Sequence, residues 1–186
     1  ALLAICRSLI SNTEWRTAWF FASRSDKYLL TETQQGLHLV VQTRDQVMGR
    51  AIFVDKSPFD SQLIDFAFTS VPSLSCRRLF DIGAHVGTIS LYGAHLGFEE
   101  IFAFEPDPEN YVALRANVVL NKADDLIRCH NVALSDRNQE DTILELNQTN
   151  MGGHRLRPDV GQTQSEAQGS SSIRVKTMKI DSAVDP

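Results

Sequence analysis

Residues 77–134 carry the most regular hydrophobic pattern in the chain. Three apolar segments of strand length follow one another: Arg78–Ile82, Glu100–Phe104 and Leu126–Leu134. A helix-like stretch, Val86–Leu96, lies between the first two, with Gly97 in the position of a C-cap. A second helix begins after Asp107, a good N-cap, with Pro108 in its first turn, and runs to about Asn121. The order strand, helix, strand, helix, strand predicts an α/β fold with a parallel sheet and right-handed crossovers.

Residues 1–36 are predicted to form a helix and a polar connector. Ala1–Ile10 has helix-like character. Trp15 and Trp19 lie four residues apart on one helical face, with Phe20 nearby. We expect this aromatic group to pack onto its own domain rather than to bind a partner.

Residues 37–70 are predicted to form a hairpin followed by a helix. Leu37–Gln42 and Ala51–Val54 are β-prone, and Gly49 lies in the connection between them. Ser61 is a plausible N-cap for the short apolar helix Gln62–Phe68.

The pattern changes again after residue 140. Thr142–Leu146 and Ile173–Met178 are β-prone and are expected to pair antiparallel. Between them, Asp159–Ser172 is rich in Gln, Ser and Gly and is predicted to be a mobile loop. We therefore divide the chain into a lead-in, residues 1–70, and a cofactor-binding domain, residues 71–186.

Composition narrows the class of protein. The 186 residues include 18 Lys and Arg and 23 Asp and Glu, which gives a net charge of −5, and 42% are hydrophobic. This is globular composition, and the mild acidity without a basic stripe indicates that nucleic acid is not a partner. Three distant cysteines, Cys6, Cys76 and Cys129, predict neither a disulfide framework nor a metal site.

No apolar run approaches the roughly 18 residues of a membrane span. We expect a soluble domain, with the cytoplasm favoured as its compartment. The chain begins with Ala rather than Met, so an upstream targeting or anchor segment stays open. The oligomeric state also stays open.

The most informative group of residues is Asp81–Gly87, together with Glu105 at the end of the next predicted strand. In a doubly wound sheet the ligand lies over the carboxyl ends of the strands. Glycines in the first turn let the backbone approach it, and an acid about 20 residues further on accepts hydrogen bonds from ribose hydroxyls. Glu105 follows Gly83 by 22 residues and fits that role.

The same residues favour S-adenosylmethionine over NAD. A dinucleotide site usually shows G-x-G-x-x-G, whereas this chain has Gly83 and Gly87 separated by three residues. Asp81 lies at the mouth of the turn, where its carboxylate would repel a pyrophosphate. That carboxylate suits the ammonium and sulfonium end of S-adenosylmethionine.

Several segments together resemble the FkbM-type methyltransferase family. They are Phe80–Ser90, Ala103–Pro108, the pair Asn117 and Asn121, Val132–Asp136, Met151–His154 and Thr177–Ser182. The resemblance covers residues 37–182. It implies the front half of a Rossmann-like class I methyltransferase fold, S-adenosylmethionine as cofactor, and O-methylation of a small molecule or a sugar.

The resemblance also implies roles for individual residues. Asp81, Gly83, Ala84 and Gly87 would lie at the methionine end of the cofactor, and Glu105 would hold the ribose. Asp136 resembles the residue that faces the adenine amino group. His85 stands where the family commonly has Asn. It is expected to contact the cofactor, with a role as a base as the alternative.

The family pattern continues beyond the point where this chain ends. A further core strand with a Lys-Ile-Asp-x-Glu-Gly-like motif does not occur before Pro186. We therefore expect residues 1–186 to be a fragment that is poorly stable and inactive by itself, since the first strand of the sheet would form an exposed apolar edge.

Methyl transfer to a hydroxyl often benefits from a general base, and His154 beside Gly152 and Gly153 is the candidate. Two other functions remain open at this point. One is a non-catalytic nucleotide-binding or scaffold domain of the same fold. The other is an NAD-dependent oxidoreductase, which the glycine spacing and Asp81 disfavour.

Overall fold

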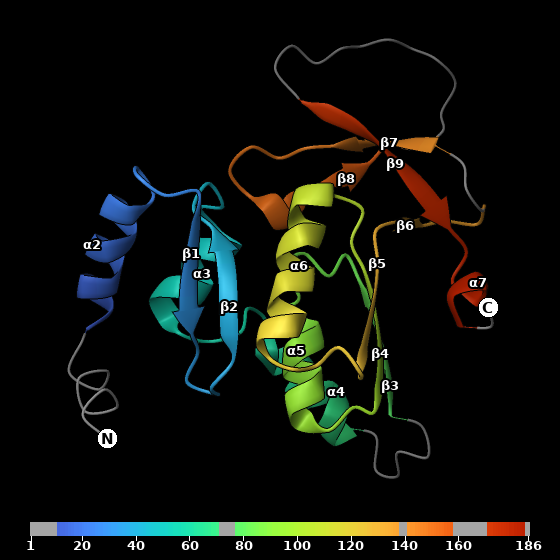
Figure 1. Ribbon diagram of the computed structural model, residues 1–186, viewed down its shortest axis with the longest axis horizontal. Helices are drawn as coiled ribbons and strands as arrows, with labels where there is room; N and C mark the ends of the chain where they lie inside the picture. The colour runs from blue at the N-terminus through green and yellow to red at the C-terminus, as the bar shows by residue number, and fades with distance from the viewer. Residues whose placement is uncertain (1–10, 71–76, 138–140, 158–170, 185–186) are drawn as a thin grey trace.

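A computed structural model describes residues 11–70, 77–137, 141–157 and 171–184 of the chain (Figure 1). Its helices are α2 (Asn12–Ala22), α3 (Met48–Asp55), α4 (Ser61–Ser70), α5 (Thr88–Leu96), α6 (Pro108–Leu120), η1 (Met151–Gly153) and α7 (Asp181–Val184). Its strands are β1 (Tyr28–Glu32), β2 (His38–Gln42), β3 (Arg78–Ile82), β4 (Glu100–Phe104), β5 (Ile127–His130), β6 (Ala133–Leu134), β7 (Asp141–Glu145), β8 (Arg155–Leu156) and β9 (Ser172–Met178). The predicted Ala1–Ile10 helix and most of the predicted 159–172 loop lie outside these residues.

The predicted parallel sheet is confirmed as β3-β4-β5, paired in register from Arg78 with Glu100 and from Ile101 with Ile127. Its helices follow the predicted caps at Asp107 and Gly97, but α5 begins at Thr88 rather than at the predicted Val86, with Gly87 as its N-cap. The Asp107 carboxylate accepts the N–H groups of Glu109 and Asn110 at the start of α6. Gly97 ends α5 with a φ of 103°, a conformation that favours glycine.

The third strand is shorter than the predicted Leu126–Leu134. Asn131 ends it, because its side-chain Nδ2 donates to the backbone oxygens of Glu105 (2.8 Å) and Pro106 (3.2 Å) and turns the chain. The two residues of β6 then join a different sheet by pairing with β9.

The prediction that Ala51–Val54 forms a strand paired with β2 is wrong. Ala51–Val54 lies inside α3, and β2 instead pairs antiparallel with β1. The Asp45 carboxylate accepts the N–H groups of Val47, Met48 and Gly49, and this capping starts a helix. The β-prone residues of that helix are buried in the core, so packing outweighs their strand propensity.

Asn117 of α6 and Asn121, the C-cap of that helix, attach the lead-in to the sheet domain. Asn117 accepts the N–H of Val40 at 2.7 Å and donates to the oxygens of Val40 and Val86. Asn121, one turn later, makes the corresponding pair of bonds with the backbone of His38. The two side-chain amides thus take the place of a neighbouring strand along the free edge of β2.

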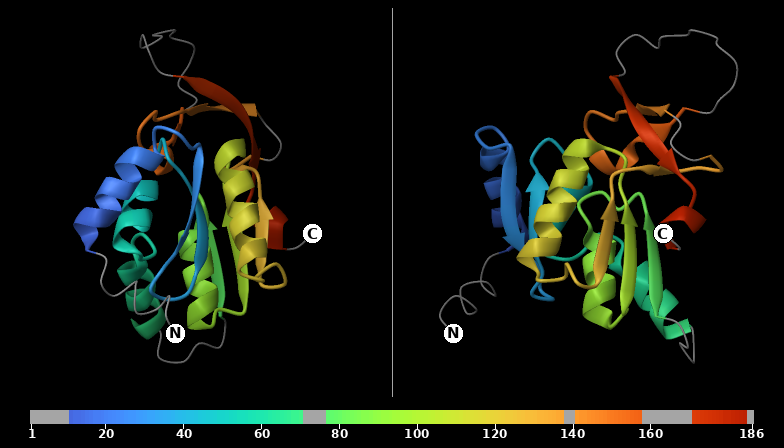
Figure 2. Two further views of the ribbon diagram at one scale, coloured as in Figure 1. Left: turned by 60° about the vertical axis from the view of Figure 1, so that its left-hand side comes forward. Right: turned by 45° about the vertical axis from the view of Figure 1, so that its right-hand side comes forward.

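The core is continuous across residue 70. Figures 1 and 2 show the helices α5 and α6 on one face of β3-β4-β5, with the β1-β2 hairpin and α3 packed beyond α6. One buried cluster joins Leu39 and Ile52 of the lead-in to Leu91, Ile101 and Leu114 of the sheet domain. The opposite face of the sheet carries a smaller cluster that α7 covers.

The tryptophans of α2 pack against the lead-in core as predicted. The rings of Trp15 and Trp19 lie 5.6 and 5.5 Å from the ring of Phe53. Phe20 does not join them, since it is 51% exposed. Among the described residues, none of the helices is long and apolar enough to cross a membrane.

The second sheet, β6-β9-β7-β8, lies above the carboxyl ends of β3 and β4 (Figure 1). The predicted antiparallel pairing of its two long strands is confirmed, with Thr142 opposite Val175. Below it, β3 pairs only with β4 among the described strands, and Ile82 is 63% exposed on it. The expected exposed edge of the sheet is therefore present in the described part of the chain.

Candidate functional site

The turn between β3 and α5 uses most of its own hydrogen-bond donors. The N–H groups of Gly83 and Ala84 both donate to the oxygen of Phe104 at 2.9 Å, and Gly87 N–H donates to Ala84 O at 2.7 Å. His85 N–H donates to Glu105 Oε2. Among the described residues, the Val86 N–H is the one donor of this turn without such a bond, so four of the five N–H groups are already used.

Backbone conformation explains why glycine recurs here. Gly83 and Gly87 have φ values of 83° and 86°. A Cβ on Gly83 would meet no heavy atom within 4 Å, so this face of the turn is open to a ligand. A Cβ on Gly87 would lie 2.5 Å from Leu114 Cδ1, so this glycine lets α6 pack closely.

Glu105 lies just past the carboxyl end of β4 and is held by two backbone donors. Its Oε2 accepts the His85 N–H at 2.7 Å, and its Oε1 accepts the Asp107 N–H at 2.8 Å. Burial raises the pKa of Glu105 to about 7, although both N–H bonds favour the charged form. Each carboxylate oxygen retains an acceptor position, which suits a ligand with two neighbouring hydroxyls.

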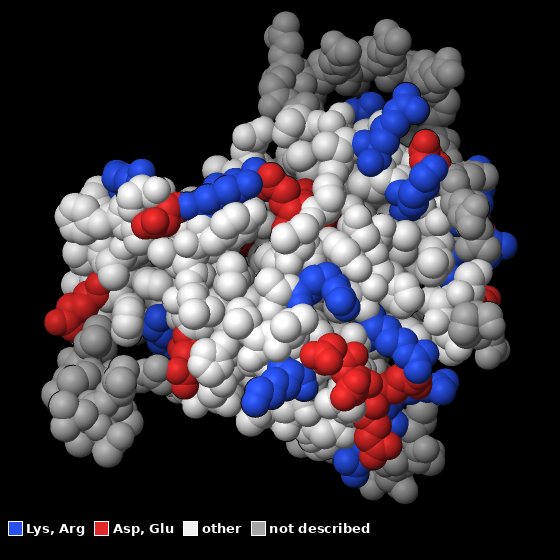
Figure 3. Space-filling model, in the orientation of Figure 1, with Lys and Arg blue, Asp and Glu red and all other residues white. Residues whose placement is uncertain are grey.

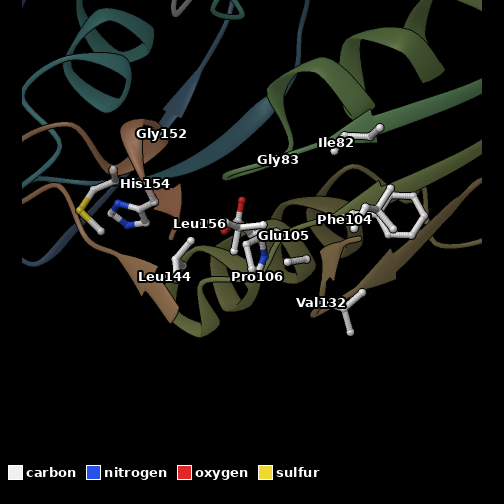
Figure 4. Close-up of a pocket in the computed structure, with 13 residues that line it drawn as sticks. Ile82, Gly83, Phe104, Glu105, Pro106, Val132, Leu144, Gly152, His154 and Leu156 are labelled. Carbon is white, nitrogen blue, oxygen red and sulfur yellow. The ribbon is translucent and has the colours of Figure 1, made fainter. Parts of the chain in front are cut away.

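A cavity opens in front of Glu105 between the two sheets. Its walls come from the ends of β3 and β4, from β6 and from the segment around η1 (Figure 4). The lining residues are Ile82, Gly83, Phe104, Glu105, Pro106, Val132, Ala133, Leu134, Leu144, Met151, Gly152, His154 and Leu156. Glu105 lies between the His154 ring and Phe104 in this view, as an acceptor in a mainly apolar wall.

His154 lines the cavity, but its ring nitrogens face the protein. Nδ1 accepts the Asn147 N–H at 3.0 Å, and Nε2 lies 3.2 Å from Asp107 Oδ2. Burial opposes the charge on Asp107, but the contact with His154 and the N–H bonds of α6 lower its pKa. The neutral tautomer that fits has its proton on Nε2, so its lone pair is already engaged. In this arrangement His154 joins the η1 segment to Asp107 at the start of α6, and its two nitrogens lie next to Asn147 and Asp107.

His85 is buried behind the turn. Its φ is 52°, its side chain is 4% exposed, and its Nε2 lies 3.3 Å from Oδ2 of the fully buried Asp45. Burial lowers the pKa of His85 to about 4 although Asp45 opposes this, so the ring is neutral at neutral pH. Its backbone fixes Glu105, and its side chain contacts the lead-in rather than the cavity.

The remaining predicted residues lie outside the cavity wall. Asp81 is buried beneath the turn, where its Oδ2 accepts the Ser90 hydroxyl at 2.6 Å, and burial raises its pKa. Ala84 belongs to the hydrophobic core. The Asp136 side chain is 87% exposed beside Arg137. The structure thus brings Gly83, Glu105 and His154 together around one cavity.

The sequence did not predict most of the apolar wall. It also did not predict the contact of Asp45 with His85 or that of Asp107 with His154. Phe104 and Leu134 end predicted strands. Their positions at the carboxyl edge of the sheet could have indicated that they line the ligand site. Asp45 gave none, because its contact with His85 joins residues 40 positions apart. In the described ranges, no group of three His, Cys, Asp or Glu side chains is arranged to hold a metal ion.

Comparisons with known proteins identify a family and several partly similar structures. Residues 81–185 match the methyltransferase FkbM domain family. Curated protein sequences give no match. Three solved structures with partial similarity are Pyrococcus horikoshii TYW2 in complex with MeSAdo, at 22% identity and a TM-score of 0.43, Methanocaldococcus jannaschii Trm5 in complex with adenosine, at 17% and 0.43, and an S-adenosylmethionine-dependent methyltransferase from Agrobacterium tumefaciens, at 14% and 0.40.

These similarities are partial on both sides. They cover 62%, 62% and 57% of this chain, and 40%, 35% and 32% of the respective solved chains. The chain therefore spans two fifths or less of the length of these proteins.

Proposed function

Because the chain belongs to the methyltransferase FkbM domain family, we propose that it transfers the methyl group of S-adenosylmethionine to a hydroxyl oxygen of a small molecule or sugar. S-adenosylmethionine is the cofactor of this family. The observation that carries the proposal is Glu105, a fixed carboxylate with free acceptor positions beside the open face of Gly83.

The described residues fit this cofactor. The two acceptor positions of Glu105 suit the ribose hydroxyls, and the open face of Gly83 leaves room for the ligand against the backbone. The wall formed by Phe104, Val132 and Leu134 suits an apolar purine face. Four of the five N–H groups of the turn are already bonded, so few of them are left for a pyrophosphate, which supports S-adenosylmethionine over NAD.

When bound, S-adenosylmethionine supplies an electrophilic methyl group with a neutral thioether leaving group. The protein then needs to align the acceptor oxygen with the methyl carbon and to exclude water. The sheet β6-β9-β7-β8 covers the carboxyl ends of β3 and β4 and suits the second task. His154 orients this cover through Asn147 and Asp107, and we assign it a positioning role rather than that of a base.

A small acceptor suits the surface of the chain better than a nucleic acid. The net charge is −5, and acidic and basic side chains are interspersed on the face drawn in Figure 3. Nucleic-acid affinity depends on many clustered Lys and Arg side chains. Which hydroxyl compound is used depends on contacts that the described cavity wall does not specify.

The test is methyl transfer itself. The longest natural form of the protein that contains residues 1–186 is incubated with S-adenosylmethionine carrying a labelled methyl group. The acceptors are sugars and small alcohols, each paired with its deoxy analogue. Label in a hydroxyl compound but not in its deoxy partner supports the proposal. Binding of S-adenosylhomocysteine without transfer to any acceptor would favour the non-catalytic binding domain instead.

A further inference from the structure

A second cavity lies between α2 and the start of α3, and it shares no residue with the cavity in front of Glu105. Its lining residues are Arg16, Trp19, Phe20, Ser23, Arg24, Gln46 and Arg50. Three of these seven carry a positive charge and none carries a negative charge. In a chain with a net charge of −5, this local excess of arginine is unusual.

Helix periodicity explains how the three arginines meet. Arg16, Phe20 and Arg24 follow at intervals of four residues, so they line one face of α2 and its C-terminal turn. Arg50 comes from α3, which packs against α2. All three side chains are exposed at the mouth of the cavity.

Within the described residues, no carboxylate pairs with any of the three arginines. Three acids near the arginines along the chain have other partners. Glu14 accepts from the backbone and hydroxyl of Ser11, and Asp26 accepts from Ser25. Asp45 is fully buried beneath the first turn of α3. Three like charges around one cavity repel each other, and an anion between them would relieve that repulsion.

The cavity is also partly ordered for a ligand. The Arg24 guanidinium lies 3.5 Å from the centre of the Phe20 ring, and its Nη1 donates to Phe20 O at 2.6 Å. Most of its five N–H donors stay available. The buried Trp19 donates from Nε1 to Gln46 Oε1, and Gln46 in turn donates to Thr43 O, so these two residues are held in place.

We propose that this cavity binds a phosphate group. The planar guanidinium fork matches phosphate oxygens in pairs, and ring-stacked arginine is well suited to that geometry. The group would belong either to a soluble phosphate compound or to a lipid headgroup. The exposed ring of Phe21, 66% accessible and 5.3 Å from Phe20, provides the apolar neighbour that a lipid surface would use. This site is independent of the methyl-transfer site and of its cofactor.

Two binding measurements on the whole chain test the proposal and separate its two sources. The first is calorimetric titration with inorganic pyrophosphate. The second is co-sedimentation with phosphatidylcholine vesicles, with and without phosphatidic acid. The variant Arg16→Gln/Arg50→Gln removes two charges from the cavity, and Arg155→Gln/Arg174→Gln removes two exposed charges from the distant sheet. Thermal melts confirm that both variants fold.

We expect the unmodified chain to bind pyrophosphate, or to bind vesicles only when they contain phosphatidic acid. The cavity variant should weaken that binding by roughly tenfold for each arginine removed, and the sheet variant should leave it nearly unchanged. Pyrophosphate binding identifies a soluble ligand, and vesicle binding alone identifies a headgroup. Failure in both measurements, or equal weakening by both variants, would overturn the proposal.

Discussion

The carboxylate of Glu105 accepts the backbone N–H of His85 at 2.7 Å, so the end of β4 is joined to the turn that follows β3. His85 in turn contacts Asp45 of the lead-in through its side chain. The acceptor that we assign to the ribose is therefore positioned by residues from both halves of the chain.

Cofactor affinity should depend on pH through Glu105. Its pKa is raised to about 7 by burial, so the carboxylate of the empty site is protonated as the pH falls below that value. Two ribose hydroxyls donate best to the ionised form. The Kd for S-adenosylhomocysteine should therefore rise by up to about tenfold per pH unit below about pH 7. Titration calorimetry measures this slope, and a constant Kd between about pH 5 and about pH 8 would count against the role of Glu105.

The buried ring of His85 should make the folded protein less stable at acidic pH. Its folded pKa, about 4, lies below the ordinary value of 6.5. The folded protein thus binds fewer protons here than the unfolded chain, and stability is lost as the pH falls from about 6.5 toward 4. At about 1.4 kcal/mol per pKa unit, the loss is roughly 3 kcal/mol.

The raised pKa of Glu105 has the opposite effect, because it makes the folded protein more stable as the pH falls through this range. The two effects are separated by comparing variants. Urea unfolding of His85→Asn should show a smaller loss of stability in acid than the unmodified chain. His38→Asn changes an exposed histidine and should follow the unmodified chain. An acid loss in His85→Asn equal to that of His38→Asn would contradict the assignment.

Asp107→Ala should destabilise the fold by roughly 2–4 kcal/mol. The substitution removes the cap of α6 and leaves the buried Nε2 of His154 without its carboxylate. Urea unfolding measures the change. The exposed Asp125→Ala is the matched control, and it should stay within roughly 0.5 kcal/mol of the unmodified chain. Equal effects of the two substitutions would show that neither the cap nor the contact between Asp107 and His154 stabilises the fold.

Gly49→Ala should also destabilise, although alanine is the better helix former by roughly 1 kcal/mol. A Cβ at this position would lie 2.9 Å from the backbone oxygen of Gln42 and 3.1 Å from Asp45 Cβ. Backbone cannot yield as a flexible side chain can, so we expect a net loss of roughly 1–3 kcal/mol by thermal or urea unfolding. A more stable variant would mean that α3 packs less closely on β2.

Local signals were sufficient for the sheet domain. The caps at Gly97 and Asp107 and the apolar strand between them act within a few residues of each other. The error at Ala51–Val54 arose where two local signals compete, since β-branched residues favour strands while the Asp45 carboxylate starts a helix. Burial against β2 and α2 decides that competition, and no single segment reveals it.

The candidate site could be predicted only in part, because it too depends on contacts between segments that are far apart in the sequence. Gly83 and Glu105 follow from strand ends and spacing, and both line the cavity. His154 was expected as a base, but its surroundings depend on Asn147 and on Asp107, which lies 47 residues earlier. Asp136 was expected to face the adenine. Its side chain is 87% exposed, and its role stays a prediction.

The most direct test of the central claim is calorimetric titration of S-adenosylhomocysteine into the chain, with NAD as the competing ligand. Three proteins are compared: the unmodified chain, Glu105→Gln, and Glu99→Gln, which changes an exposed acid at the other end of β4. We predict saturable binding that is at least tenfold weaker in Glu105→Gln and unchanged in Glu99→Gln, and we predict that NAD does not displace the bound S-adenosylhomocysteine. No saturable binding by the unmodified chain, or equal binding by Glu105→Gln in its folded form, would contradict the assignment of this cavity as the cofactor site.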